Sequence, residues 1–222
     1  MKKSIISLLA AVLACTSAHA VVLSQNVDPT TILAGNSVAC GGGGTTTANT
    51  WFRSFSFANF GVNGDFSLQS ATFGIEQVTG TVPITVSIYA GTSVTSLGTL
   101  IASSTFNLTA AQNNTFFTLT LSGTVPFASG GLVMSVGAPD GSANGTAFYI
   151  GSNAGGQTGP GYILAPACGI NAPTDIAAIG FPNDHILMSV TGTVVPEPST
   201  YAMMGVGGIL ACAMVLRKRA RG

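Results

Sequence analysis

The amino-acid sequence predicts an all-β protein, an antiparallel β-sandwich or jelly roll of about nine or ten strands, with a segment of a different kind at each end. Three observations lead to this prediction. Hydrophobic and polar residues alternate with a period of two in many short runs. Glycine, asparagine and proline interrupt these runs roughly every eight to twelve residues. No interior stretch of about ten residues keeps the 3.6-residue period of an amphipathic helix.

Charged side chains are scarce and lie mainly at the two ends. The 222 residues include 7 Lys and Arg and 7 Asp and Glu, so 6% of the residues are charged and the net charge is zero. Apart from Arg53, every basic residue lies within the first three or the last six positions. Because phosphate binding needs clustered Lys and Arg, this composition excludes a nucleic acid as a partner.

Residues 1–20 have the three parts of a secretory signal peptide. Lys2 and Lys3 form the basic start, residues 5–14 are apolar, and Ala18 and Ala20 flank a histidine in an A-x-A cleavage site. We therefore expect cleavage after Ala20 and export of the remaining chain.

Two alternatives for this segment stay open. One is a permanent N-terminal membrane anchor, although the apolar run is shorter than the roughly 20 residues that span a bilayer. The other is a lipobox, which residues 12–15 resemble, with cleavage before Cys15 and lipidation of its thiol.

The expected strands of residues 21–194 each turn one apolar face toward a common core. In the first, Trp51, Arg53, Phe55 and Phe57 share a face. The same period groups further side chains on single faces, namely Val82, Ile84, Val86, Ile88 and Ala90; Phe117, Leu119 and Leu121; Leu132, Met134 and Val136; and Ile186, Met188 and Val190. The glycine-rich residues 41–44 are expected to form a flexible linker before these strands.

Two cysteines, Cys40 and Cys168, remain in the exported domain. Cys15 leaves with the signal peptide and Cys212 lies in the C-terminal apolar segment. In an oxidising compartment such a pair most simply forms a disulfide. Its long loop would stabilise the fold by roughly 4–5 kcal/mol. The alternative is a nucleophilic Cys40 assisted by His185.

The sequence offers little support for catalysis. His185 is the only histidine of residues 21–194 and follows Asp184 in a segment typical of a turn. One imidazole cannot build a histidine-rich metal site, and a Ser-His-Asp triad would depend on it alone. We expect His185 to be a turn residue and the protein not to be an enzyme. A secreted hydrolase that uses Asp184 and His185 is an alternative.

One short segment imitates the start of a calcium-binding loop. Asp140, Ser142 and Asn144 place oxygens at positions one, three and five, and Gly145 occupies position six. Position twelve, however, is Gly151 instead of the glutamate that closes an EF-hand. We expect this segment to be the tip of a β-hairpin, and we expect neither a metal nor a cofactor. A calcium site in this loop stays open as the alternative.

The C-terminal residues combine three features in a fixed order. Two prolines in the segment Val195, Pro196, Glu197 and Pro198 keep it extended. Residues 201–216 are apolar and barely long enough to cross the hydrocarbon core as a transmembrane helix. A basic cluster then holds the end in the cytoplasm by the positive-inside rule; it consists of Arg217, Lys218, Arg219 and Arg221.

This combination resembles the PEP-CTERM sorting signal of Gram-negative bacteria, and the resemblance covers residues 195–222. It implies recognition by an exosortase, a membrane enzyme similar to cysteine transpeptidases. It further implies a transient stay in the inner membrane, removal of the tail near the Pro-Glu-Pro motif, and delivery of the domain to the cell surface or extracellular matrix. A plain C-terminal membrane anchor is the alternative.

A second resemblance concerns the domain itself. Residues 73–76, 149–153, 168–170 and 179–183 are similar to segments of a recurrent β-rich module in secreted bacterial proteins. That resemblance implies a secreted β-domain and assigns no catalytic residue.

From these features we expect an exported protein with a structural or adhesive role in an exopolysaccharide or biofilm layer. The main alternative is a carbohydrate-binding module, in which Trp51, Tyr89, Tyr149 or Tyr162 would stack on the sugar rings of a matrix polysaccharide.

Overall fold

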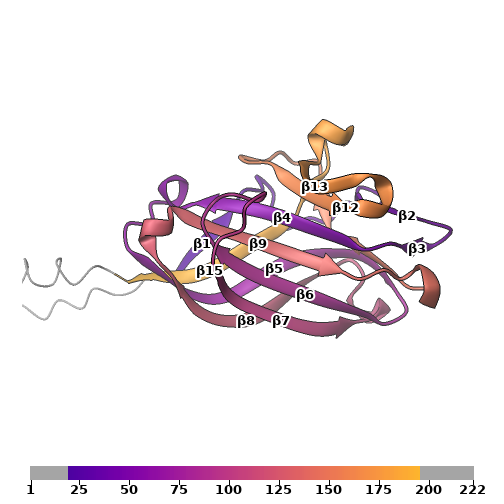
Figure 1. Cartoon of the computed structure of the whole chain (residues 1–222), viewed down its shortest axis with the longest axis horizontal. Helices are drawn as coiled ribbons and strands as arrows, with labels where there is room; N and C mark the ends of the chain where they lie inside the picture. Colours follow the sequence, from indigo (N-terminus) through magenta and orange to yellow (C-terminus); the bar gives the residue numbers. More distant parts are fainter. Residues whose placement is uncertain (1–19, 196–222) are drawn as a thin grey trace, which may run out of the picture.

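The computed structural model describes residues 20–195, and over this range the protein is all-β, as the sequence predicts (Figure 1). Its helical elements are short 3-10 turns. The strands are β1 (Ala20–Ser24), β2 (Gly41–Gly42), β3 (Thr45–Thr46), β4 (Asn49–Ser56), β5 (Asp65–Thr79), β6 (Val82–Ala90), β7 (Leu100–Leu108), β8 (Thr115–Val125), β9 (Gly131–Ala138), β10 (Ala147–Ile150), β11 (Ser152–Asn153), β12 (Gly161–Ala165), β13 (Ile170–Asp175), β14 (His185–Ile186) and β15 (Met188–Val195).

Two antiparallel sheets form the expected sandwich. The first has five strands in the order β1-β15-β5-β10, with β8 on the other side of β5. The second has six strands in the order β13-β12-β4-β9-β6-β7. The strand count exceeds the expected nine or ten partly because β2, β3, β11 and β14 have only two residues each. Pairs that short leave no period in the sequence.

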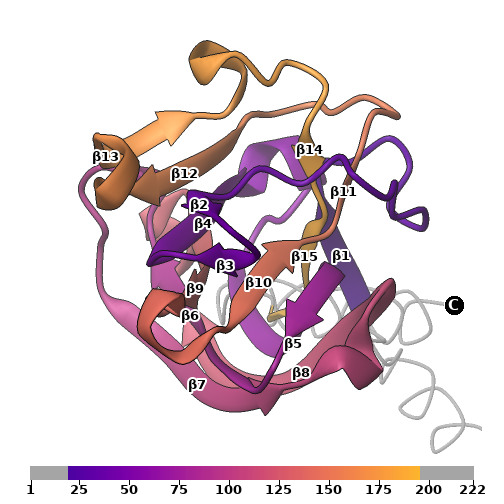
Figure 2. The same ribbon diagram turned by 90° about the vertical axis from the view of Figure 1, so that its right-hand side faces the viewer.

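The long strand β5 organises the first sheet. Its residues 65–73 pair with β15, residues 75–79 pair with β10, and residues 66–75 pair with β8. Viewed along the strands, the two sheets wrap around one interior, and β7 of the second sheet lies beside β8 of the first (Figure 2).

The predicted apolar faces fill that interior. Trp51, Arg53 and Phe55 of β4 are fully buried, and so are the inward-facing residues of β6 and β9. Trp51 contacts Phe148 of the first sheet edge-to-face, with ring centroids 5.6 Å apart. Phe148 in turn packs against Phe73 of β5 at 6.3 Å. Aromatic side chains therefore join the two sheets across the core.

Two loop predictions were wrong. The segment around Gly145 does not cap a hairpin, because β9 before it pairs with β4 and β6 whereas β10 after it pairs with β5. It carries the chain from one sheet to the other. Asp-Gly and Asn-Gly pairs indicate a turn but do not determine which strands the turn connects.

The second concerns the glycine run, expected as a flexible linker, which forms a tight hairpin between β2 and β3. Gly43 and Gly44 both have positive φ, +64° and +85°, as a two-residue type I′ turn requires.

The first and last strands of the described range are neighbours. In the antiparallel pair of β1 and β15, Ala20 lies opposite Thr193. The two ends of the domain therefore emerge together, on the left in Figure 1. Within residues 20–195, none of the helical segments has the length and hydropathy needed to cross a bilayer. The predicted signal peptide up to residue 19, the motif from Pro196 onward, the transmembrane helix and the basic tail lie outside the described residues.

Candidate functional site

A cavity of about 240 Å³ lies between two loops that are far apart in sequence. One wall is formed by residues 35–37, which precede β2, and the other by residues 180–184, which precede β14. In Figure 2 the indigo segment between β1 and β2 crosses β11 and β14 at this place.

Hydrogen bonds to Ser152 of β11 hold the first loop in position. The N–H of Leu33 donates to the Ser152 carbonyl at 2.8 Å. The Ser152 hydroxyl donates to the Asn36 carbonyl at 2.6 Å and accepts from the Asn36 side-chain amide at 2.9 Å. The same amide donates to the carbonyl of Asn183 at 3.1 Å, which ties the two walls together.

Two carboxyl groups face this region. Asp184 lines the cavity and is 5% exposed. Glu76 of β5 accepts the N–H of Gly35, a lining residue, at 2.8 Å. One oxygen of each group, Asp184 Oδ1 and Glu76 Oε2, is buried and has no hydrogen-bond partner among the described residues.

Burial raises the pKa of Asp184 to about 7, since a carboxylate loses hydration there. The nearby negative charge of Glu76 adds to this effect, whereas the Ser152 hydroxyl and the charge of Arg53 oppose it. The ionised form of Asp184 is therefore poorly compensated by its surroundings.

The only basic side chain of the described residues, Arg53, is completely buried in the core beside this region. Its guanidinium donates to the carbonyl of Ile186 through Nε at 3.0 Å and through Nη2 at 2.7 Å. Nη1 donates to Gln25 Oε1 and the carbonyl of Gly159, and Nη2 also donates to Gln157 Oε1. Burial lowers the pKa of Arg53 to about 10, with the charge of Asp184 opposing the shift.

Both ring nitrogens of His185 face backbone groups. Nδ1 accepts the N–H of Gly156 at 3.0 Å, and Nε2 lies 3.2 Å from the carbonyl of Pro182. This arrangement places the ring proton on Nε2, which donates to Pro182. The imidazole fastens two loops to β14 and leaves neither nitrogen for a serine or cysteine nucleophile.

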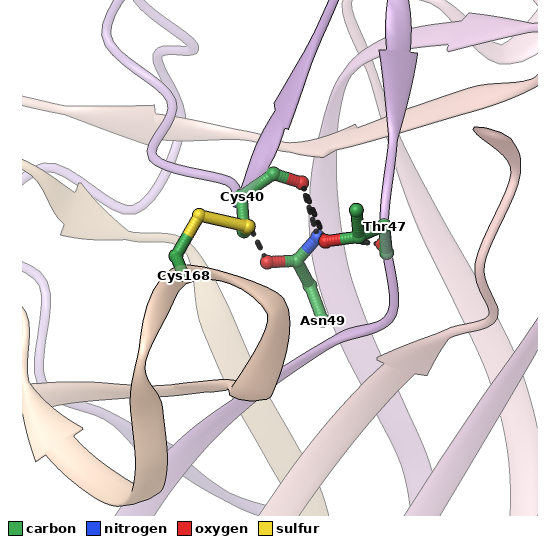
Figure 3. The surroundings of a disulfide bond; sticks show 4 residues. All are labelled: Cys40, Thr47, Asn49 and Cys168. Atoms are coloured by element: carbon green, nitrogen blue, oxygen red, sulfur yellow. Dashed lines mark hydrogen bonds between the residues drawn. A yellow bond between two sulfur atoms is a disulfide. The ribbon is translucent and has the colours of Figure 1, made fainter.

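The disulfide between Cys40 and Cys168 is present, as the sequence predicts (Figure 3). It joins the start of the β2–β3 hairpin to the turn before β13, across a sequence separation of 128 residues. The Asn49 side chain secures the buried end, because its Oδ1 accepts from the Cys40 N–H at 2.8 Å and its Nδ2 donates to the Cys40 carbonyl at 3.0 Å. The cysteine pair is therefore structural.

The candidate calcium loop uses its own oxygens internally. Asp140 Oδ1 accepts from the backbone N–H of Ser142 at 2.9 Å and from its hydroxyl at 2.6 Å. These bonds lower the pKa of Asp140, which is exposed. The arrangement is a local turn that closes on itself.

The four aromatic candidates for sugar stacking separate into two groups. Trp51 is unavailable because it is fully buried and donates its indole N–H to the Val38 carbonyl at 2.9 Å. Tyr89 and Tyr162 are partly exposed and pack with Phe52 on the outer face of the second sheet. Tyr149 belongs to β10 of the first sheet.

Sequence reasoning missed most of the cavity. Asp184 was noted only as a possible partner of His185, and Ser37, Asn36 and Glu76 were not singled out. They come from three separate segments, and no pattern within one segment joins them. Arg53 did carry a signal, since the only basic residue of the domain lay on the same strand face as Trp51 and Phe55.

At the C-terminus, the described fold ends at Val195, which pairs with Asp65 and is 46% exposed. A β-sandwich that ends immediately before a proline-rich segment, an apolar stretch and a basic cluster defines a class of exported domains with a C-terminal sorting tail. Residues 194–219 match the PEP-CTERM protein-sorting motif. The motif implies export, a membrane-anchored stage in transit, and processing by an exosortase.

Comparisons of the whole chain are more distant. The chain matches no curated protein. It is similar to the cysteine protease and lectin-like domains of Cwp84, a surface layer associated protein of Clostridium difficile, at 16% identity over 68% of this chain and 33% of that chain, with a TM-score of 0.42. A clostridial cysteine protease after propeptide cleavage gives 16%, 68%, 37% and 0.45 for the same quantities. The structure of infectious bursal disease virus, Gx strain, gives 12%, 92%, 49% and 0.31. The chain spans about a third of the length of the two clostridial structures.

Proposed function

We propose that this protein is a non-enzymatic component of the bacterial cell surface or extracellular matrix, with a structural or adhesive role in an exopolysaccharide or biofilm layer. Its β-domain would be released from the inner membrane by an exosortase and would carry out its role outside the cell. The observation that carries the proposal is the PEP-CTERM motif at residues 194–219.

The position of the motif relative to the fold supports this proposal. β15 ends at Val195, one residue before the first proline of the motif. Cleavage within the Pro-Glu-Pro segment would therefore leave every strand pair of the sandwich in place. The disulfide and the low charge of the domain suit an exported protein.

The backbone bonds of His185 support a non-enzymatic role. A hydrolase based on Asp184 and His185 would need one imidazole nitrogen free to accept a proton from a nucleophile. Both nitrogens face backbone groups. A hydrolytic turnover that disappears in the His185→Ala variant would contradict this part of the proposal.

The sorting step is tested by replacing Pro196, Glu197 and Pro198 with alanine in the full chain. We expect the variant to stay uncleaved in the inner membrane, because the enzyme loses the extended segment that it recognises. Membrane fractionation and immunoblotting measure the ratio of uncleaved to released protein.

The matched control is Ser199→Ala, which changes the next residue and leaves both prolines and the glutamate intact. It should be processed like the unaltered chain. Release of the triple-alanine variant at the normal rate would refute the sorting proposal, as would surface-delivered protein that still carries Arg217 to Arg221.

Binding to matrix polysaccharide is a second candidate function, and Tyr89 and Tyr162 favour it. Both are partly exposed on one outer sheet face, where Tyr89 pairs with Val133 and Tyr162 with Phe52. Tyrosine rings in such a position can stack on pyranose faces. The test is retention of the protein on immobilised exopolysaccharide, which should fall in the double variant Tyr89→Ala/Tyr162→Ala. Tyr149→Ala, on the other sheet, should retain binding; equal retention by all three proteins would exclude this surface.

A further inference from the structure

Three buried oxygens without hydrogen-bond partners gather at the cavity between residues 35–37 and 180–184. They are Ser37 Oγ, Glu76 Oε2 and Asp184 Oδ1, each without a partner among the described residues. Ser37 and Asp184 line the cavity, and Glu76 binds the N–H of Gly35 in the same wall. Buried oxygens of this kind are costly unless some group compensates them.

The charges at this place favour a cation. Glu76 and Asp184 are close enough for each carboxylate to disfavour the ionised form of the other. Arg53 is the nearby positive charge, but its five hydrogen bonds all go to carbonyl and amide oxygens. Two carboxylates and one guanidinium leave a net charge of −1 to be balanced.

The donor atoms determine which cation fits. Within residues 20–195, no group of three His, Cys, Asp or Glu side chains is placed to hold a metal, so a zinc-type site is excluded there. The cavity instead presents two carboxylates, a hydroxyl and the carbonyls of its loop walls. Such oxygen-only sets with irregular geometry suit calcium, which accepts six to eight oxygens, better than the smaller and strictly octahedral magnesium.

We propose that this cavity is a calcium site in which Asp184 and Glu76 supply the charged ligands and Ser37 supplies a hydroxyl. The site joins β5 to the loops before β2 and β14, so an ion held there cross-links three segments that hydrogen bonds already bring together. With two carboxylates, the expected dissociation constant is about 0.1–1 mM, the range of extracellular calcium modules.

The test is thermal unfolding of the full chain, purified in detergent, in EDTA and then in 10 mM CaCl₂. Binding to the folded state alone should raise the midpoint by about 3–6 °C for a domain of this size. Isothermal titration calorimetry with CaCl₂ measures the affinity directly, and an equal concentration of MgCl₂ should give a smaller shift.

Two variants and one control locate the ion. Asp184→Asn and Glu76→Gln should each weaken calcium binding at least tenfold and abolish the shift. Neither should lower the midpoint in EDTA, because each removes a charge that its surroundings do not compensate. Asp140→Asn, in the loop that imitates an EF-hand, should bind calcium like the unaltered chain.

Several results would overturn the proposal. These are no calcium-dependent shift and no binding heat at 10 mM, a shift that persists in both Asp184→Asn and Glu76→Gln, or a shift lost only in Asp140→Asn. If Asp184→Asn does not fold, Glu76→Gln decides alone, since Glu76 is only partly buried. Exosortase processing has separate readouts, so failure here leaves the sorting proposal untouched.

Discussion

A single buried guanidinium does much to unite the two sheets. Arg53 lies on β4 of the second sheet and binds the carbonyl of Ile186, next to the first sheet's β15, through two nitrogens. Its planar fork satisfies several fixed acceptors at once, which a lysine ammonium cannot do in the same geometry. The period of two placed this side chain on the apolar face, but the sequence contains no pattern that identifies its distant acceptors.

Substitution of Arg53 should therefore be strongly destabilising. Arg53→Met is expected to lower the free energy of unfolding by about 3 kcal/mol, because it leaves buried oxygens of Gly159, Gln25 and Gln157 without donors. Arg53→Lys should recover only part of that loss. Urea unfolding followed by the fluorescence of Trp51 measures both variants, and a midpoint equal to that of the unaltered protein would contradict the assigned role.

Asp28 provides a pH dependence of known sign. Hydrogen bonds from the hydroxyl of Thr31 and from the backbone and hydroxyl of Thr30 lower the pKa of Asp28 from 3.8 to about 2. A carboxyl whose pKa is lower in the folded protein stabilises it fully above pH 4. That contribution is lost as the pH falls from about 4 to about 2.

The variant Asp28→Asn keeps an acceptor oxygen at this turn but cannot titrate. Thermal midpoints measured from pH 5 to pH 2 should fall less steeply for the variant than for the unaltered protein. Parallel curves over this interval would show that the Asp28 carboxylate does not stabilise the turn.

At the level of elements, the sequence predicted strands far better than their connections. The faces of β4, β6, β9 and β15 follow from the period of two, because burial on one face of a sheet imposes that period. The segment around Asp140 instead crosses between sheets, and the glycine run folds as a hairpin. Turn residues specify local backbone angles, whereas the path of a connection depends on contacts with distant strands.

The same limit explains the candidate site. Ser37, Glu76 and Asp184 meet because the loop before β2 packs over Ser152 of β11. That contact joins two coil segments that have no periodic signal. The cysteine pair was predictable because export leaves only two candidates, so elimination replaced geometry.

The disulfide stabilises the loop between Cys40 and Cys168 by restricting the unfolded chain. For a separation of 128 residues, the double variant Cys40→Ser/Cys168→Ser should lose about 5 kcal/mol of unfolding free energy. Reversible urea unfolding without reductant measures this loss. Unaltered protein treated with dithiothreitol is the control and should unfold like the double variant. Equal stability of the oxidised and serine forms would contradict the prediction.

At the scale of the whole molecule, the sandwich is complete before the sorting tail begins. A chain that stops after Val195 should keep the thermal midpoint of the full chain, because every described strand is retained. A chain that stops after Leu187 should fail to fold, since it loses β15 from between β1 and β5. Calorimetry of the two truncated proteins makes the comparison, and a lower midpoint for the first would show that the tail contributes to the fold.

The interior position of β15 has a mechanical consequence. If the exported domain is attached through its C-terminus, tension enters at Val195 and runs along a strand that is hydrogen-bonded on both sides, to β1 and to β5. Pulling this strand out would require two ladders to shear together, instead of one edge peeling away bond by bond. A domain tethered in this way would resist flow and drag at its attachment point.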